Sequence, residues 1–130
     1  MEKRFSDHFK LSYGDAPYDI HLEAWPAGGD IVASVTGGTR PHVGAVALAE
    51  PEETRHPVTG EPMGRGGGIR VSALVSEGHK DAILAEMFAR GLCENYGVRV
   101  CASAGVHVDG AGEKEIALLL ENAKSLLEMI

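Results

Sequence analysis

The sequence lacks the features of membrane-spanning, secreted and nucleic-acid-binding proteins. Its longest apolar run, Val43 to Leu48, is far too short to span a bilayer, and its first residues lack the apolar stretch of a secretory signal. Nineteen acidic residues against twelve basic ones leave a formal net charge of -7, which repels phosphate backbones and anionic lipids. We therefore expect a cytoplasmic protein that binds neither nucleic acid nor membrane.

Cysteine is scarce, and the common signatures of nucleophilic catalysis are missing. Cys93 and Cys101 show no Cys-x-x-Cys spacing, which argues against a zinc ribbon or a redox pair, so we expect two reduced core residues. The sequence contains no Gly-x-Ser-x-Gly elbow and no His-Glu-x-x-His pair. These absences favour a binding site over a nucleophilic enzyme.

Length and periodicity predict a single α+β domain spanning residues 1–130, since a chain of this length supports one hydrophobic core. Apolar positions about four residues apart predict one helix that ends near Gly97 and a second from Glu113 to Met129. Short β-rich stretches between turn residues predict strands at 5–13, 18–25, 31–35, 43–49, 69–75 and 98–102. We expect a largely antiparallel sheet of six strands covered by the two helices.

The segment from Glu50 to Gly68 holds three prolines and five glycines and shows no periodicity, which predicts a long loop. Unstructured loops of this length in compact domains are often lids or binding loops, so this one is a candidate cover for a site. The glycines around Arg65 would allow that side chain to reach over an anion. A mobile surface excursion is an equally good interpretation.

Nine consecutive residues, 36–44, combine a flexible backbone with a cation and an imidazole. Gly37 and Gly38 follow a strand-like run and would allow a ligand to approach backbone N–H groups, with Arg40 close by. Phosphate is the natural guest of such a site, although two glycines and a proline also mark an ordinary tight turn. The candidate binding residues in this segment are Thr36, Gly37, Gly38, Thr39, Arg40, Pro41, His42 and Gly44.

Three histidines stand near the ends of predicted elements. His42 lies in the glycine-bearing segment, His107 follows Gly105 at the end of a predicted core strand, and His79 stands at a helix start. Histidine is the commonest metal ligand, so these three are candidate ligands of a divalent ion. Gly105 and His107 would join the phosphate site if the two segments converge, whereas a lone histidine in such a place is usually a hydrogen-bonded core residue.

Four segments together resemble the small D subunit associated with the gallate and protocatechuate type of UbiD decarboxylases, a family described as prenylated-flavin chaperone-like. They are Thr36-Gly37-Gly38, Pro41-His42-Val43-Gly44, His79-Lys80-Asp81 and Ala104-Gly105-Val106-His107-Val108. The resemblance runs from near Ile31 to the C-terminal helix, and it does not account for Arg40 or the glycine-rich loop. The positions that match the family pattern are Gly37, Gly38, Pro41, His42, Gly44, His79, Gly105 and His107.

The resemblance implies a non-catalytic accessory protein that binds reduced prenylated FMN, with or without a divalent metal ion. It also implies that the protein delivers this cofactor to a partner UbiD-type decarboxylase. A flavin mononucleotide would bring a dianionic phosphate for Arg40 and a ring that needs apolar walls. The loop from Glu50 to Gly68 would close over this ring.

Two other hypotheses stay open. In the first, the chain is a small metal-dependent hydrolase or lyase in which His42, His79 and His107 hold the ion and Asp109 or Glu77 acts as the base. In the second, the glycine turn and the histidines only support an oligomer interface. We expect a homo-oligomer, because small binding domains often place their sites between identical chains.

Overall fold

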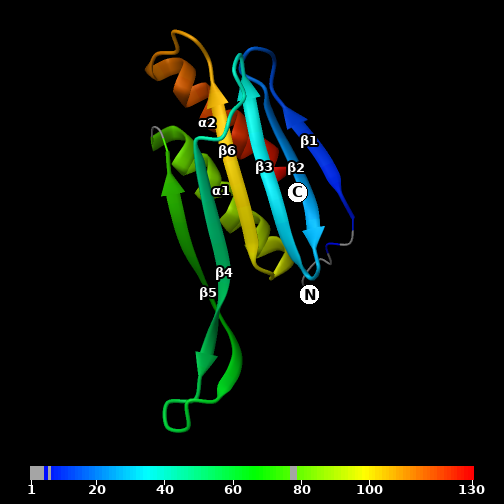
Figure 1. Ribbon diagram of the computed structural model, residues 1–130, viewed down its shortest axis with the longest axis vertical. Helices are drawn as coiled ribbons and strands as arrows, with labels where there is room; N and C mark the ends of the chain where they lie inside the picture. Colours follow the sequence, from blue (N-terminus) through cyan, green and yellow to red (C-terminus); the bar gives the residue numbers. More distant parts are fainter. Residues whose placement is uncertain (1–4, 6, 77–78) are drawn as a thin grey trace.

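The structure, a computed structural model, describes residues 5, 7–76 and 79–130, without the side chains of residues 65–67 and 79. Its strands form one six-stranded sheet in the order β1-β2-β3-β6-β4-β5 (Figure 1). The elements are β1 (Phe9–Tyr13), β2 (Ile20–Ala27), β3 (Asp30–Gly38), β4 (Ala45–Arg55), β5 (Pro62–Val75), α1 (His79–Tyr96), β6 (Val100–His107) and α2 (Glu113–Glu128).

The sheet is mixed, with one parallel pair among antiparallel ones. β6 enters between β3 and β4, runs parallel to β3 from the Ile31–Val100 pair to the Gly38–His107 pair, and runs antiparallel to β4. The pairs β1–β2, β2–β3 and β4–β5 are antiparallel. The predicted α+β class, with six strands and two helices, is confirmed, and the sheet is largely antiparallel as expected.

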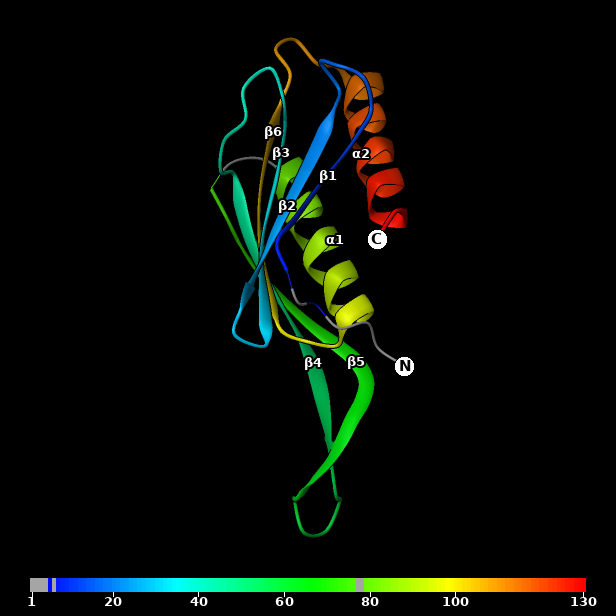
Figure 2. The same ribbon diagram turned by 90° about the vertical axis from the view of Figure 1, so that its right-hand side faces the viewer.

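Both helices cover the same face of the sheet (Figure 2). Alternate strand residues point toward them, and the α1 side chains of Leu84, Phe88 and Leu92 are fully buried. Beneath α1, β4 and β6 carry mainly alanine on this face, and such short side chains leave room for the large residues of the helix. In the described part of the chain, neither helix has the length and hydrophobicity needed to cross a membrane.

The other side of the sheet, here called the open face, faces the viewer in Figure 1 and carries no helix. The strand residues that alternate with the core residues lie on this face. On its strands β2 to β6 these include His21, Glu23, Trp25, Asp30, Val32, Ser34, Thr36, Val46, Leu48, Glu50, Arg70, Ser72, Leu74, Cys101, Ser103, Gly105 and His107.

The two cysteines lie on opposite sides of the sheet. Cys93 is buried in the core, as predicted, whereas Cys101 is only partly buried. The prediction that Cys101 is a core residue is wrong, because the register of β6 turns Ala102 toward the helices and Cys101 toward the open face. The two residues are not joined in a disulfide.

The prediction of a loop from Glu50 to Gly68 is wrong, because most of this segment is strand. β4 continues to Arg55 and β5 begins at Pro62, so the two form a hairpin arm, residues 52–64, that projects beyond the sheet (Figure 1). Glu53 pairs with Arg65 across register shifts that follow Pro51. The arm packs on no core, so both of its faces are exposed and its sequence has no reason to alternate.

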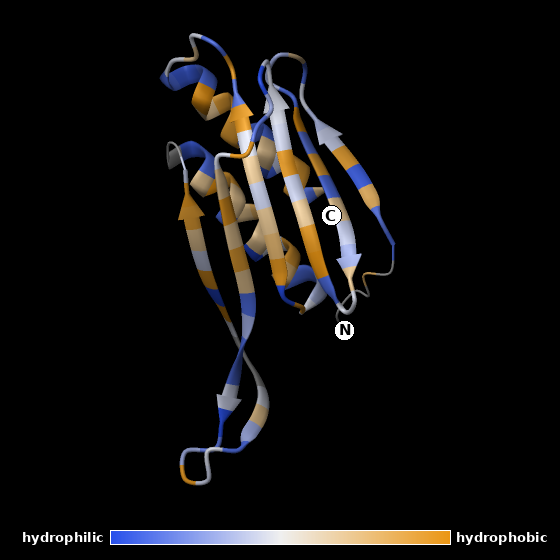
Figure 3. Cartoon of the chain, viewed as in Figure 1, coloured by the Kyte–Doolittle hydropathy of each residue, from blue (hydrophilic) through white to orange (hydrophobic). Residues whose placement is uncertain are grey.

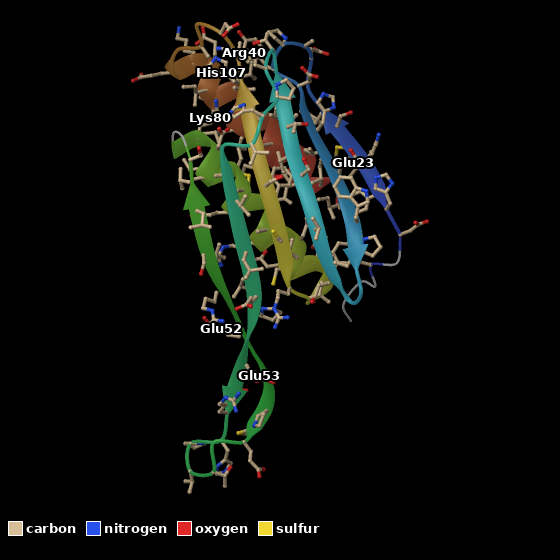
Figure 4. All side chains as sticks on the ribbon, in the orientation of Figure 1. Glu23, Arg40, Glu52, Glu53, Lys80 and His107 are labelled. Atoms are coloured by element: carbon tan, nitrogen blue, oxygen red, sulfur yellow. The ribbon has the colours of Figure 1, made fainter. Side chains whose placement is uncertain are left out.

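The arm also lies far from the position that a lid over the candidate site would need. Figure 4 places Glu52 and Glu53, at the start of the arm, toward the opposite end of the molecule from Arg40 and His107. The tip is closed locally, since the His56 ring accepts hydrogen bonds from the backbone of Val58 and Thr59. The expectation that this segment covers the candidate site is therefore wrong within this single chain.

Replacing residues 54–63 with Asn-Gly should leave the fold intact. All of the removed side chains are exposed, so the free energy of unfolding should change by no more than about 0.5 kcal/mol. Urea denaturation measures this change. Phe88→Ala, a truncation in the buried core, is the reference variant and should lose about 3–5 kcal/mol of the free energy of unfolding. A comparable loss in the shortened variant would contradict the independence of the arm.

Candidate functional site

The connection between β3 and β4, residues 39–44, crosses the end of β6 and is called the strap below. The strap has to cross because β6 lies between the two strands that it joins. Its backbone bonds to β6 as it passes: Thr39 N and Arg40 N donate to His107 O at 2.8 and 3.1 Å, and Gly44 N donates to Ala104 O at 2.8 Å. The two glycine-bearing segments singled out in the sequence are thus brought together.

The glycines around the strap are required by close approach of the chain to itself. A Cβ on Gly105 would lie 1.7 Å from His42 O, and one on Gly38, which has a φ of 80°, would lie 2.2 Å from His107 O. Four positions would place a Cβ within 2.2 Å of an oxygen of the chain: Gly37, Gly38, Gly44 and Gly105. Atoms of the chain itself already occupy the space beside these four glycines. The predicted contact between a ligand and their backbone stays a prediction.

Asp81, in the first turn of α1, fastens the strap to the rest of the domain. Its side chain is buried, and Oδ1 accepts a hydrogen bond from Val106 N at 3.1 Å. Oδ2 lies 3.0 Å from His42 Nε2, and Gly44 packs against the same carboxylate. The positive end of the helix dipole favours a carboxylate at this position. One buried group therefore joins α1, β6 and the strap.

Sequence reasoning gave Asp81 no role of its own. The available signal was an acidic residue in the first turn of a predicted helix, a pattern usually explained by the helix dipole alone. Nothing in the sequence shows that the strap passes this helix end.

His42 is hydrogen-bonded at both ring nitrogens. Nδ1 lies 3.0 Å from Arg40 O, and Nε2 faces the Asp81 carboxylate. Both ring nitrogens therefore face oxygen atoms of the chain itself. A metal ion would need one of these nitrogens as a lone-pair donor and would have to break a bond that holds the strap.

Arg40, His107 and Asp109 form an exposed polar cluster beside His42, at the end of β3 and β6 (Figure 4). Arg40 Nη2 lies 2.8 Å from Asp109 Oδ1 and 3.1 Å from His107 Nε2, and the imidazole nitrogen is itself 3.1 Å from Asp109 Oδ1. The Arg40 side chain is 68% exposed and that of His107 is 40% exposed. The rings of His42 and His107 are 6.5 Å apart.

The remaining candidate residues of the strap region have simpler surroundings. Thr39 Oγ1 donates to His107 O at 3.2 Å, and Thr36 pairs with Gly105 on the open face. Pro41 is exposed on the strap. The structure thus gathers Thr39, Arg40, His42 and His107 into one place and leaves Thr36 on the adjoining part of the sheet.

The described residues offer no metal site. Among the described side chains of residues 5, 7–76 and 80–130, no three His, Cys, Asp or Glu residues stand close enough to hold an ion. His79 begins α1 as predicted, but its side chain and Glu77 lie outside the described residues. The proposed set of His42, His79 and His107, and with it the metal-dependent hydrolase or lyase, gains no support from the described part.

The prominent clefts of the described residues are not lined by Arg40 or His107. One of about 830 Å³ lies at the base of the arm and includes Glu50, Arg70 and Arg99 in its lining. A hydrogen bond from Arg70 holds the pKa of Glu50 below its ordinary value, so this cleft is lined by charges that already pair with each other. Two smaller clefts measure about 560 and 400 Å³, and neither is lined by Arg40, His42 or His107. The lining of the smaller one includes the candidate residue Thr36.

A family model described as the prenylated flavin chaperone LpdD-like domain matches residues 14–130. The chain belongs to this family. The matched region contains the strap, the polar cluster and both helices, so the family suggested by the four sequence segments is confirmed. The comparison with curated proteins found no match.

Among solved structures, this LpdD-like domain is similar to a chain in the crystal structure of a novel chaperone complex for yeast 20S proteasome assembly. The two share 11% sequence identity with a TM-score of 0.62, over 95% of this chain and 90% of the other. At this identity the likeness shows a shared fold and nothing about the ligand.

Gly105→Ala should destabilise the LpdD-like domain, because the new methyl group would overlap His42 O. We expect a loss of about 1–3 kcal/mol or more in the free energy of unfolding, measured by urea denaturation. Gly29→Ala is the matched control, since a Cβ there has no neighbour within 4 Å. Equal stability of the two variants would contradict the close crossing of strap and strand.

Asp81→Ala should release the end of β6 as well as lower stability. It removes the acceptor of Val106 N, and losing one partner of a buried hydrogen bond costs about 1–3 kcal/mol. Amide hydrogen exchange at Val106 should therefore accelerate beyond any global change. Asp109→Ala, at an exposed carboxylate, should leave Val106 protected, and unchanged Val106 exchange in Asp81→Ala would refute the anchoring role.

Proposed function

We propose that this chain binds reduced prenylated FMN and delivers it to a UbiD-type decarboxylase without catalysing a reaction itself. Membership of the prenylated flavin chaperone family supports this function. The observation that carries the placement of the cofactor is the exposed cluster of Arg40, His107 and Thr39 at the end of β3 and β6. It gathers a cation, an imidazole and a hydroxyl on the strap and the strand end beneath it.

The residues of this cluster fit the phosphate of a flavin mononucleotide. An arginine carries five N–H donors in a planar fork that matches phosphate oxygens. The bonds from Arg40 to His107 and Asp109 both start at Nη2, so Nη1 and Nε add further donors on a largely exposed guanidinium. His107 supplies a second group that can donate to an anion when it is protonated.

Asp109 sets the strength of this phosphate site. Its carboxylate forms an ion pair with the guanidinium of Arg40, so an incoming phosphate competes with it for the same N–H donors. Both partners of the ion pair are exposed, and such pairs contribute little stability, so exchanging the carboxylate for a dianion costs little. This arrangement suits a protein that has to release its ligand to another.

The flavin ring would meet the open face, where a cleft of about 400 Å³ is lined in part by Ser34 and Thr36. Beside the cluster, the open face presents Thr36, Ser34 and Ser103, which are small, and Val46, which is apolar. When bound, the prenylated flavin supplies the reactive group for the decarboxylase, and this chain supplies the surface that holds it. The residues present therefore fit the phosphate and offer one wall for the ring.

The same geometry supports a carrier over an enzyme. The buried carboxylate of Asp81 is satisfied by Val106 N and by the His42 ring, and the second nitrogen of that ring bonds to the backbone. The described hydrogen bonds of these groups are made within the chain, where they hold the strap in place.

Anaerobic calorimetric titration with FMN, riboflavin and reduced prenylated FMN tests the proposal. FMN should bind at least about tenfold more tightly than riboflavin, because only FMN has the phosphate for Arg40. Arg40→Ala should abolish this difference, while Asp109→Asn should preserve or increase the affinity for FMN, since it frees the guanidinium.

Arg55→Ala is the matched control, because it removes an exposed arginine of the arm. It should leave all three affinities unchanged. Equal affinities of the unmodified chain for FMN and riboflavin would contradict the binding of the phosphate by Arg40. Absence of binding by reduced prenylated FMN would overturn the proposed function.

A further inference from the structure

A cleft of about 560 Å³ lies between α2 and the connection from β1 to β2, and it is called the α2 cleft below. Its lining includes Tyr13, Asp15, Tyr18, Leu118 and Asn122. Figure 2 shows the connection passing beside α2 at the end of the molecule where that helix begins. No residue of the strap lines this cleft, so it is separate from the candidate phosphate site.

Asn122 carries an unpaired acceptor into this cleft. The residue is only 8% exposed, and its Nδ2 donates to Tyr18 O at 2.9 Å, which fixes the orientation of the amide because a carbonyl oxygen can only accept. The other end of the amide, Oδ1, makes no hydrogen bond to any residue that the structure describes. In that same part of the chain no polar side-chain atom is both fully enclosed and unpaired. The Oδ1 atom is therefore accessible, and the cleft is the space that Asn122 lines.

The fold explains only half of this side chain. Asn122 stands among buried apolar residues of α2, namely Leu119, Ala123 and Leu126. The bond to Tyr18 O accounts for the amide nitrogen and holds the β1–β2 connection to the helix. The oxygen has no such role, although polar atoms of buried residues are nearly always paired. A ligand that donates a hydrogen bond would pair it.

The rest of the lining favours a ligand with a positive charge. Asp15 contributes an exposed carboxylate, and the aromatic rings of Tyr13 and Tyr18 have electron-rich faces that attract cations. No lysine, arginine or histidine is among the described residues that line the cleft. An anion would therefore meet a carboxylate and an amide oxygen without any basic side chain to offset them.

Leu118 adds an apolar surface for the body of such a ligand. Figure 3 shows the start of α2 in blue and the following stretch in orange, and Leu118 belongs to this hydrophobic stretch. Leu118 is nevertheless 42% exposed where it lines the cleft. An alkyl chain that carries a guanidinium or ammonium group combines an apolar stem with N–H donors and a positive charge.

We propose that the α2 cleft binds an organic cation of this kind. An N–H group of the cation donates to Asn122 Oδ1, its charge lies near Asp15 and the tyrosine rings, and its alkyl stem covers Leu118. Free alkylguanidines and alkylamines carry this chemistry, and so do the arginine and lysine side chains of proteins. The proposal is independent of flavin binding, because it uses none of the residues assigned to the phosphate.

Titration with n-butylguanidinium and with n-butylurea, followed by heteronuclear NMR at physiological salt, tests the proposal. The two probes have the same shape and differ in charge. The guanidinium should bind at least about tenfold more tightly, because the urea gains nothing from Asp15 or from the π faces. The signals that move should include the side-chain amide of Asn122 and the backbone amide of Leu118.

Three variants examine the separate contacts. Asp15→Asn and Tyr13→Leu change exposed residues, and each should weaken guanidinium binding by about three- to tenfold. Asn122→Leu should abolish it, with circular dichroism to show whether the variant folds. Should Asn122→Leu not fold, the first two variants decide. Glu121→Gln is the matched control, because it removes an exposed carboxylate of α2 outside the cleft and should leave the affinity unchanged.

A capped Gly-Arg-Gly peptide distinguishes the two sources of the cation. Tighter binding of the peptide than of butylguanidinium supports the site and assigns it to an arginine of a partner protein, and weaker binding supports it as a site for a small free cation. Equal affinities for butylguanidinium and butylurea would overturn the proposal. So would an affinity that Asp15→Asn and Tyr13→Leu leave unchanged, since the cation would then bind elsewhere on the acidic surface. Arg40→Ala should not alter cation binding, whatever it does to FMN.

Discussion

The buried carboxylate of Asp81 is the constraint on which the functional end of this protein depends. β6 is inserted between β3 and β4, so the chain between those strands has to cross it. The crossing brings backbone oxygens so close to the glycines that a Cβ there would overlap them. Asp81 then ties the crossing segment to α1 and to Val106 through two hydrogen bonds. The exposed cluster of Arg40 and His107 is positioned by this anchored crossing.

This arrangement separates two kinds of residue that look alike in the sequence. The glycines and His42 build the crossing, and their chemistry is largely used within the chain. Arg40 and His107 lie on the outside of the crossing, where an exposed guanidinium and an imidazole remain accessible to a ligand. A rigid support with an accessible rim agrees with a protein that holds a cofactor and passes it on.

Much of the fold was predictable from local patterns, and the errors have physical causes. The alternation of apolar and polar residues predicted β2, and the helical spacing of apolar residues predicted α2, because each of these elements has one buried side. The arm was missed because both of its faces meet solvent, so its strands carry no alternation. The meeting of residues 36–44 with 104–108 was anticipated, but Asp81 was not, because its role depends on a long-range crossing that no local pattern encodes.

Transfer of cofactor between proteins tests the central claim most directly. The chain would be loaded with reduced prenylated FMN, separated from free cofactor, and mixed anaerobically with an apo UbiD-type decarboxylase. The account predicts that the decarboxylase gains flavin and activity as the chain loses flavin, while the loaded chain alone turns over no aromatic acid. Flavin that stays with the chain, or decarboxylation by the chain alone, would contradict the account.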